Sequence, residues 1–406
     1  MLTKRSDVKT TIWKLINFLV VKSKKKIYMV PHNNGRGDKY DLINFSADNI
    51  LTLLNYAKDS EDFKDCTFFV ECYSEQRSEK IKEYVSAWKI RVVPILSDET
   101  EEHPNRNTRT RIRNFLIRYS CKTWISCTPF AGWNEKLKSQ RFICLSYSTP
   151  LKSGTTLFQH DLRHLDNFLE TSLLTASVHA AQYRNRLTEC PIIGFPRNDR
   201  LFCDDKRQII QQWIKTKTDV AYEKLIVYAP TYRDYENAYD DCSVLGFKNN
   251  SFELEQFLHD NNILLIAKFH PYQKLTTVKY TPHIIPYEKS YDFSLYDLLA
   301  CSDMLISDYS SVIHDYIITG KPVVIDCFDY EKYEDSRGFA FEPVDYVLPG
   351  RVCGTFEELK AQITDELSRN TRQEKYYEVQ KMFHKYIDNE SSKRVLDFLK
   401  GCIYGR

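Results

Sequence analysis

Several short polar segments of this sequence come directly after apolar runs, and their residue types suit the binding of phosphate. The clearest is Ser307–Ser311 (SDYSS), which follows the apolar run 304–306. We expect Ser310 and Ser311 to open a helix beside Asp308, because free N–H groups and the positive dipole end at a helix start bind phosphate. The alternative is structural, since Asp308 or Ser310 alone could be an ordinary helix N-cap.

Two more segments of this kind follow apolar runs in the second half of the chain. In 268–271 (KFHP), His270 could donate to phosphate or exchange a proton near neutral pH, unless it only caps a loop. In 228–234 (YAPTYRD), Thr231 and Arg233 could hold phosphate oxygens, the arginine in a planar fork. The alternative for this segment is a turn with a surface Arg–Asp pair.

A fourth and a fifth segment complete the set. In 329–339 (DYEKYEDSRGF), the carboxylates could meet ribose or polyol hydroxyls and Arg337 a phosphate, unless the segment is a solvated charged loop. Residues 146–154 (SYSTPLKSG), which include Lys152, lie in the first half of the chain and would face the other segments across a cleft. Each segment is a weak signal alone, but their common position after expected strands predicts one shared site.

The elements that must position these segments alternate between short apolar runs and helical stretches, which predicts an α/β protein. A first series of expected strands includes 26–30, 67–71, 91–95, 124–127 and 142–146, and a second series begins near residue 224. The chain is expected to close with helices over 355–367 and 374–399. Two successive βα series predict two Rossmann-like domains with the ligand between them, beyond the carboxyl ends of the strands. This layout resembles the GT-B arrangement of nucleotide-sugar transferases.

The expected boundaries divide the chain into a basic amphipathic segment (1–25), two Rossmann-like domains (26–200 and 201–385) and a C-terminal helix that packs back on the first domain (386–406). The formal net charge of +2 over 406 residues gives no global field for nucleic acid, so no nucleic-acid partner is expected. The 12 cysteines include no CxxC pair, and we expect them to be free and mostly buried in a reducing cytoplasm.

The N-terminus carries an apolar run, 12–21, that is interrupted by polar residues and is too short to span a bilayer core, which needs about 20 residues. Lysines and arginines flank it, and one helical face is apolar: Val8, Ile12, Leu15, Ile16 and Leu19. The pattern indicates either a helix that lies on a membrane surface or an amphipathic helix that packs on the protein's own core.

Taken together, the motifs resemble the CDP-glycerol glycerophosphotransferases that build teichoic acids and related envelope phosphopolymers of bacteria. The resemblance runs from about residue 26 to 367 and is densest from Gly194 on. It rests on segments in the family's order: 194–199 (GFPRND), 228–234 (YAPTYRD), 268–271 (KFHP), 307–312 (SDYSSV), Asp315-Tyr316, Lys321-Pro322, 329–333 (DYEKY), 337–339 (RGF) and Pro349-Gly350.

The resemblance implies a GT-B fold with an acceptor domain over 26–200 and a CDP-donor domain over 201–385. It implies a CDP-glycerol-like donor, a lipid-linked acceptor whose hydroxyl attacks the β-phosphorus with loss of CMP, and a place on the cytoplasmic face of the bacterial membrane. Carried over by position, His270 is catalytic. The expected donor-binding residues are Thr231, Arg233, Asp308, Ser310, Ser311, Arg337 and Lys152. No metal site or cofactor is expected, and assistance by Mg²⁺ is left open.

One position departs from the family pattern. The family's first-domain motif reads WHGTPLK, and aligning 149–152 (TPLK) places Tyr147 where the proposed general base, a histidine, belongs. A tyrosine titrates near pH ~10 and is a poor base at neutral pH. Either another group, such as His32, is the base, or the reaction needs little base assistance, or the chain uses another substrate or has lost activity. The alternative functions are a GT-B glycosyltransferase with a CMP- or UDP-sugar donor and a donor-binding subunit without catalysis.

Overall fold

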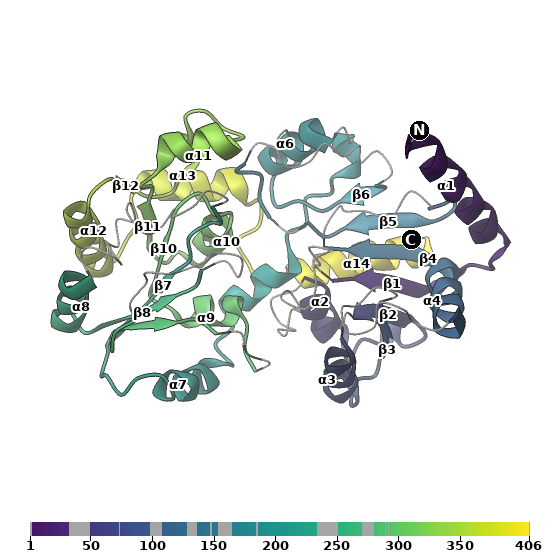
Figure 1. The fold of residues 1–406 in the computed structure, drawn as a ribbon, viewed down its shortest axis with the longest axis horizontal. Helices are drawn as coiled ribbons and strands as arrows, with labels where there is room; N and C mark the ends of the chain where they lie inside the picture. The colour runs from purple at the N-terminus through teal and green to yellow at the C-terminus, as the bar shows by residue number, and fades with distance from the viewer. Residues whose placement is uncertain are drawn as a thin grey trace.

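The computed structural model describes most of the chain. It covers residues 2–31, 49–72, 74–97, 108–127, 136–146, 148–152, 165–183, 186–233, 251–269, 280–288, 290 and 292–405. Within these ranges, two α/β halves lie next to each other, each with its own parallel sheet (Figure 1).

The first half is built on a sheet with strand order β3-β2-β1-β4-β5-β6, in which neighbouring strands pair in parallel. Its strands are β1 (Ser23–Val30), β2 (Thr67–Cys72), β3 (Arg91–Leu96), β4 (Cys121–Ser126), β5 (Arg141–Cys144) and β6 (Asn167–Phe168). One face packs against α2 (Asn49–Ala57), α3 (Glu75–Val85) and α14 (Ser391–Tyr404). The other packs against α4 (Thr108–Ser120) and α6 (Leu173–Tyr183).

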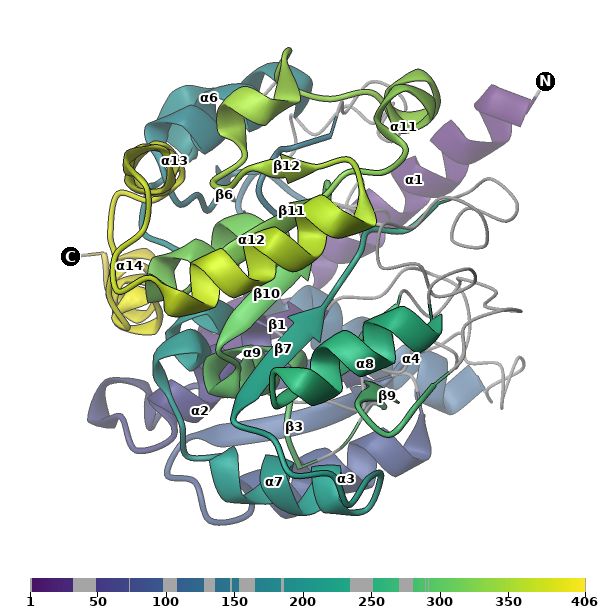
Figure 2. The same cartoon turned by 90° about the vertical axis from the view of Figure 1, so that its left-hand side faces the viewer.

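The second half repeats this plan with strand order β12-β11-β10-β7-β8-β9, again parallel throughout. Its strands are β7 (Lys224–Tyr228), β8 (Ile263–Ala267), β9 (Ile284–Pro286), β10 (Met304–Ser307), β11 (Val323–Asp326) and β12 (Val352–Cys353). In Figure 2, α8 (Ser251–Asp260) and α12 (Phe356–Ser368) cover the face turned to the viewer. The opposite face packs against α7 (Arg207–Lys215), α9 (Leu295–Cys301), α10 (Val312–Tyr316) and α13 (Glu374–Phe383).

Both sheets therefore have the strand order of the dinucleotide-binding fold, 3-2-1-4-5-6, when the strands of each half are counted in chain order. The α/β class and the pair of Rossmann-like domains expected from the alternating pattern are confirmed. In such sheets the strand order reverses between the first and fourth strands, which here are β1 and β4 in one half and β7 and β10 in the other. The crevice beyond their carboxyl ends is the usual place for a ligand.

The C-terminal region differs from the single helix expected over 374–399. The chain forms two helices, α13 and α14, because residues 384–390 leave the second half and cross to the first. At the break, the His384 ring is bonded to the backbone oxygen of His314 and the Lys385 N–H to that of Thr171. Helix α13 packs in the core of the second half and α14 in the core of the first. A periodicity argument sees one continuous apolar stripe over 374–399 and misses the break at 384–390.

The loop alternative for the charged segment 329–339 is excluded, because most of it forms α11 (Tyr330–Arg337), whose Tyr333 packs in the core while the charges face outward. The helix expected after Ser310 is present as α10, followed by a 3₁₀ turn over Ile317–Thr319. The described cysteines are free, and all but Cys203 and Cys402 are buried, as expected. None of the helices in the described part of the chain has the length and apolar character of a transbilayer segment.

Candidate functional site

Two of the segments singled out in the sequence meet at the switch point of the second sheet. Strands β7 and β10 are neighbours, with Val227 beside Leu305, so residues 229–233 and 308–311 leave the sheet side by side. The Ser307 hydroxyl donates to the backbone oxygen of Ala229 (2.6 Å) and ties the two strand ends together. The sheet topology thus places Thr231, Arg233, Asp308, Ser310 and Ser311 at one edge.

Arg233 is at the centre of a buried ion triad. Its side chain is completely buried and ion-paired with Asp308 and with Asp329, the latter through Nε–Oδ2 (3.0 Å) and Nη2–Oδ1 (2.8 Å). Asp308 Oδ1 also accepts the Thr231 N–H at 2.8 Å. A donor phosphate could reach this guanidinium only by displacing its carboxylates, and breaking a buried pair costs about 3–5 kcal/mol. The geometry therefore favours a positioning role for Arg233 and Asp308, which hold the loop that carries Thr231.

Two serine hydroxyls, those of Ser310 and Ser311, lie at the start of the helix that follows Asp308. Ser311 occupies the N-cap position of α10, but its side chain makes no capping bond. The hydroxyls of Ser310 and Ser311 are half-buried, and neither is bonded to another described residue. The N-cap alternative for Asp308 and Ser310 is not what the structure contains, since Asp308 binds Thr231 and Arg233 instead. Two hydroxyl donors beside a strand end remain available to a ligand.

Lys152 reaches this edge from the first half of the chain. Its Nζ donates to the Thr231 hydroxyl at 2.6 Å, and its backbone bridges to Phe339 of the second half. Burial lowers the pKa of Lys152 to about 8, opposed by the Asp308 charge and assisted by Arg337 and Arg233. A half-buried cation that is bonded only to a hydroxyl among the described residues is well suited to an incoming anion.

Arg337 lies at the last residue of α11, on the same side of the site. Its guanidinium carbon is 5.4 Å from the ring centroid of Tyr232, the neighbour of Thr231. It is half-buried, in contrast to the completely buried Arg233. The structure therefore brings Arg337 to Lys152 and Thr231 and leaves it more accessible than Arg233.

A third buried carboxyl stands behind the triad. Asp326, at the end of β11, accepts the Tyr228 hydroxyl at 3.1 Å, and its Oδ1 has no hydrogen-bond partner. Burial and the Asp308 charge raise the pKa of Asp326 to about 8. The carboxyl is thus mostly protonated at neutral pH, which limits the negative charge behind the phosphate-competent groups.

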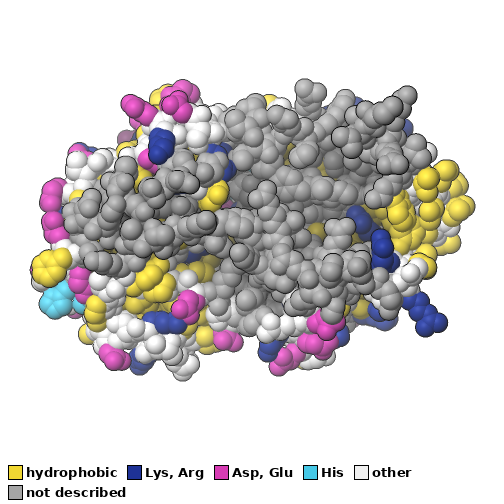
Figure 3. Space-filling view, viewed as in Figure 1, with side chains coloured by type: hydrophobic (Ala, Val, Ile, Leu, Met, Phe, Trp, Pro, Cys, Tyr) yellow, Lys and Arg dark blue, Asp and Glu magenta, His cyan; other side chains and the backbone are white. Residues whose placement is uncertain are grey.

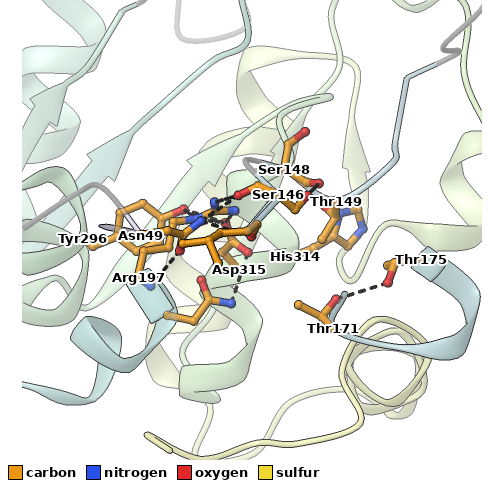
Figure 4. Close-up of polar contacts among 12 residues, drawn as sticks. Asn49, Ser146, Ser148, Thr149, Thr171, Thr175, Arg197, Tyr296, His314 and Asp315 are labelled. Carbon is orange, nitrogen blue, oxygen red and sulfur yellow. Dashed lines mark hydrogen bonds and ion pairs between the residues drawn. The ribbon is translucent and has the colours of Figure 1, made fainter. Parts of the chain in front are cut away.

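A buried polar cluster joins the two halves below the site (Figure 4). Arg197 donates to Asp315 (Nη2–Oδ2, 2.9 Å) and to the Tyr296 hydroxyl (2.7 Å). The backbone N–H of Arg197 donates to Asn49 Oδ1 (2.9 Å), and the Asn49 side-chain amide donates to the backbone oxygen of Ser146 (2.7 Å). Sequence reasoning matched Arg197 and Asp315 to motifs but gave them no role, because the contact spans 118 positions of the chain.

The same cluster fixes the segment that leads from β5 to Lys152. Ser146 is buried in a left-handed conformation (φ 59°), and Thr149 Oγ1 lies 3.2 Å from His314 Nδ1. The opposite ring nitrogen of His314 donates to the Val347 oxygen, so Nδ1 accepts the Thr149 proton in the neutral ring. Burial lowers the pKa of His314 to about 4, which keeps that ring neutral. Leu151 then inserts into the core of the second half.

Some candidates lie outside the described residues: His270, Tyr147 and His32. For His270 and Tyr147, the adjacent residues in the chain are described. Phe269 packs edge-on against Tyr228, with ring centroids 5.7 Å apart, so His270 follows the strand next to β7. Ser146 and Ser148 flank Tyr147 and are bonded to each other through a hydroxyl and a carbonyl (3.2 Å).

Comparison with known proteins identifies the family. The model of the CDP-Glycerol:Poly(glycerophosphate) glycerophosphotransferase family matches residues 57–401, which is most of the chain. The chain belongs to this family.

Two curated relatives are similar to about half of this chain. The teichoic acid glycerol-phosphate primase of Bacillus subtilis (strain 168) is 29% identical over 214 residues, which cover 52% of this chain and 51% of the relative. The teichoic acid ribitol-phosphate polymerase TarL of Staphylococcus aureus (strain NCTC 8325 / PS 47) is 31% identical over 215 residues, which cover 51% and 36%. The chain thus spans about half the length, or less, of these curated relatives.

A solved structure supports the fold of this glycerophosphotransferase family member over its full length. The wall teichoic acid polymerase TagF superposes with a TM-score of 0.69 at 18% identity, covering 100% of this chain and 96% of that chain. This likeness confirms the GT-B fold.

Proposed function

We propose that this protein transfers glycerol phosphate, or a related polyol phosphate, from a CDP-activated donor to a hydroxyl of a lipid-linked acceptor, with release of CMP. One observation carries the proposal. Two of the family's motifs meet at the switch point between β7 and β10, where the Lys152 ammonium is bonded to the Thr231 hydroxyl and the hydroxyls of Ser310 and Ser311 follow the neighbouring strand end. Such a group of donors suits a diphosphate better than a neutral sugar.

In the proposed reaction, an acceptor hydroxyl oxygen attacks the β-phosphorus and forms the new P–O bond. The bond from that phosphorus to the bridging oxygen breaks, and the electron pair leaves with CMP. Negative charge is spread over the transferring phosphoryl oxygens, so fixed donors provide most of the rate enhancement. Lys152, Thr231, Ser310, Ser311 and Arg337 are proposed to bind these oxygens directly.

The buried residues around the site are proposed to position these donors. Arg233 and Asp308 hold the loop of Thr231, and the Arg197–Asp315 pair holds the segment that carries Lys152. A site on rigid, fully bonded supports needs little reorganisation when charge develops. This division separates residues that bind the donor from residues that hold them in place.

On the resemblance, Tyr147 stands where the family has its general base, although a tyrosine hydroxyl is a weak base, and His270 is proposed as a catalytic group that contacts the diphosphate. Tyr147→Phe with full activity would remove Tyr147 as a proton carrier. Tyr147→His, which restores the family residue, should raise the rate if the missing base limits turnover. No cofactor is proposed, and activity measured with Mg²⁺ or with EDTA would test whether the diphosphate needs the ion.

The test of the reaction is a donor screen. The protein is incubated with a lipid-linked acceptor and, in turn, CDP-glycerol, CDP-ribitol and a panel of CMP- and UDP-sugars, and the released nucleotide is identified. CMP release that depends on a CDP-polyol and on the acceptor is the expected result. Sugar transfer without CMP release from any CDP-polyol would point to a glycosyltransferase, and donor binding without turnover would point to a non-catalytic subunit.

The proposal includes a place on the inner face of the bacterial membrane, through helix α1 (Leu2–Leu19). Trp13 and the buried Asn17 anchor this helix, with Trp13 5.0 Å from the ring centroid of Phe115 on α4 and Asn17 bonded to Gln140. Its other side is exposed and apolar, with Phe18 at 74% and Leu19 at 79% exposure. Of the apolar face expected from the sequence, Ile12, Leu15, Ile16 and Leu19 are exposed, which supports the membrane-surface alternative.

Helix α4 extends this surface. Ile112 and Leu116 are exposed, next to exposed Arg109, Arg111 and Arg113, and neither 11–26 nor 108–120 contains an acidic residue. Figure 3 shows hydrophobic side chains gathered at the end of the molecule where α1 lies, with lysine and arginine beside them. Apolar side chains beside basic ones suit the surface of an anionic bilayer.

Vesicle sedimentation tests the membrane part separately. The protein should sediment with phosphatidylglycerol vesicles, less with phosphatidylcholine vesicles, and the Leu15→Glu, Phe18→Glu double variant should lose this binding. Leu173→Glu, at an exposed leucine of α6, is the matched control and should bind as the wild type does. Equal sedimentation of the double variant would refute the role of α1 without touching the proposed chemistry.

A further inference from the structure

Lys152 is in an unusual position for a lysine. It belongs to the first half of the chain, yet the groups around its ammonium come from the second half: the Thr231 hydroxyl at 2.6 Å and the Tyr333 ring, with its centroid 6.0 Å away. On the side of the first half, the α6 residue Gln182 donates to its backbone oxygen (3.3 Å). Among the described residues, no carboxylate forms an ion pair with this ammonium.

The charges that face Lys152 do not neutralise it. Asp308, from the turn after β10, attracts the ammonium but is already ion-paired with Arg233. Arg233 and Arg337, from the loop after β7 and the end of α11, both disfavour a further positive charge. Tyr333 adds no negative charge, since burial raises the pKa of its hydroxyl. Lys152 is thus a half-buried cation beside two other cations, and its pKa lies at about 8 in the free protein.

We propose that Lys152 takes up a proton when the donor diphosphate enters the cleft, so that charging of this one side chain is part of donor binding. The inference rests on the proposed function, because it takes the diphosphate as the ligand. An anion within hydrogen-bonding distance favours the ammonium over the neutral amine. The same contact that binds the donor therefore shifts Lys152 to its protonated form, and the first half senses the donor through it.

The sign of the pH effect follows from linkage. Below about pH 8, Lys152 is already charged in the free protein, and donor binding needs no proton. As the pH rises through this value, the free protein loses the proton that the complex retains. The dissociation constant for the donor should then increase, approaching about tenfold for each further pH unit.

Intact CDP-glycerol, without acceptor, is the suitable probe. Both phosphates of its diphosphate are esterified, so none of its oxygens titrates near neutral pH. A proton taken up on binding at pH 8.5 must then enter the protein, and a histidine of ordinary pKa (~6.5) contributes little at that pH. Proton uptake at this pH therefore reports on a group such as Lys152.

The experiment is isothermal titration calorimetry at pH 8.5 in Tris and in Bicine, two buffers that differ in ionisation enthalpy. The observed heats should differ by the amount expected for uptake of roughly three quarters of a proton, and the uptake should vanish near pH 6.5. Lys152→Arg keeps the charge at every pH. We expect it to bind the donor without proton uptake and with an affinity that does not change between pH 7 and 9.5.

Lys321→Arg is the matched control. Lys321 is also a largely buried lysine with a lowered pKa, but its ammonium is bonded to the backbone oxygens of Ala300 and Ser302. Its substitution should leave proton uptake unchanged. If the wild type binds CDP-glycerol at pH 8.5 with the same observed heat in Tris and in Bicine, the inference is overturned and the proposed function still stands. Absence of CDP-glycerol binding at every pH would instead count against the proposed function itself.

Discussion

The ammonium of Lys152 lies 2.6 Å from the hydroxyl of Thr231, although the two residues come from opposite halves of the protein. This contact joins the segment after β5 to the segment after β7 at the edge where the donor is proposed to bind. Through this contact, the first half can respond to a ligand that the second half binds.

Thr231→Val should weaken donor binding, because it removes the hydroxyl that the Lys152 ammonium and the diphosphate are proposed to share. A hydrogen bond to a charged group contributes about 1.5–3 kcal/mol, so we expect the dissociation constant for CDP-glycerol to rise at least about tenfold. Calorimetry or ligand-protected unfolding measures it. Thr231→Ser keeps the hydroxyl and should retain most of the affinity. A valine variant with wild-type affinity would exclude this hydroxyl from the donor site.

His270→Ala should reduce turnover by about 100-fold or more, the usual size of a lost charge-stabilising or proton-transferring group. The measurement is CMP release at saturating CDP-polyol, with donor binding measured in parallel. His259→Ala, on an exposed face of α8, is the control and should be neutral. A near-normal rate for His270→Ala would refute its catalytic role.

Breaking the Arg197–Asp315 pair should destabilise the protein strongly. Both side chains are almost completely buried, at 5% and 1% exposure, so Arg197→Met leaves an unpaired buried carboxylate at a cost of about 3–5 kcal/mol. Urea denaturation followed by tryptophan fluorescence measures the loss. The exposed pair of Arg369 and Asp365 supplies the comparison, and Asp365→Asn should cost no more than about 1 kcal/mol. Equal effects of the two changes would contradict the importance of burial here.

The Asp326→Asn variant should gain folding stability relative to the wild type as the pH rises. Burial and Asp308 raise the pKa of Asp326 to about 8, so folding is opposed by its proton uptake between about pH 4, where the unfolded carboxyl ionises, and pH 8. The stability of the variant relative to the wild type should therefore increase from pH 5 to pH 8, by at most about 1.4 kcal/mol per pH unit, and then level off. A difference that is constant with pH would show that this carboxyl is ionised in the folded protein.

Gly194→Ala should cost more than Gly320→Ala, although both glycines have positive φ. At Gly194 (φ +88°), an added Cβ would meet the Ser391 hydroxyl at 2.5 Å, where α14 begins against the first half. At Gly320 (φ +72°), nothing lies within 4 Å, so only the backbone strain of about 1–2 kcal/mol applies. Thermal and urea unfolding of both variants would decide the order.

The sequence alone determined the fold class, the repeat of two βα series and the short motifs that follow strand ends. It could do so because strand and helix periodicity, and the chemistry of serine, threonine and lysine near phosphate, are local properties. The expected positions of β2, β3 and β5 agree with the structure to within one or two residues for this reason.

Only the tertiary structure decided what each polar residue does. The guanidinium of Arg233 could bind phosphate, but in the folded protein it is ion-paired with Asp308 and Asp329, which lie 75 and 96 positions away in the chain. No sequence pattern links Asn49, Arg197 and Asp315 to one another, yet together they hold the segment that leads to Lys152. Burial and pairing depend on which distant segments meet, and a local pattern does not contain that information. The sequence therefore indicates which residues can bind a diphosphate, and the fold selects those whose donors remain open to it.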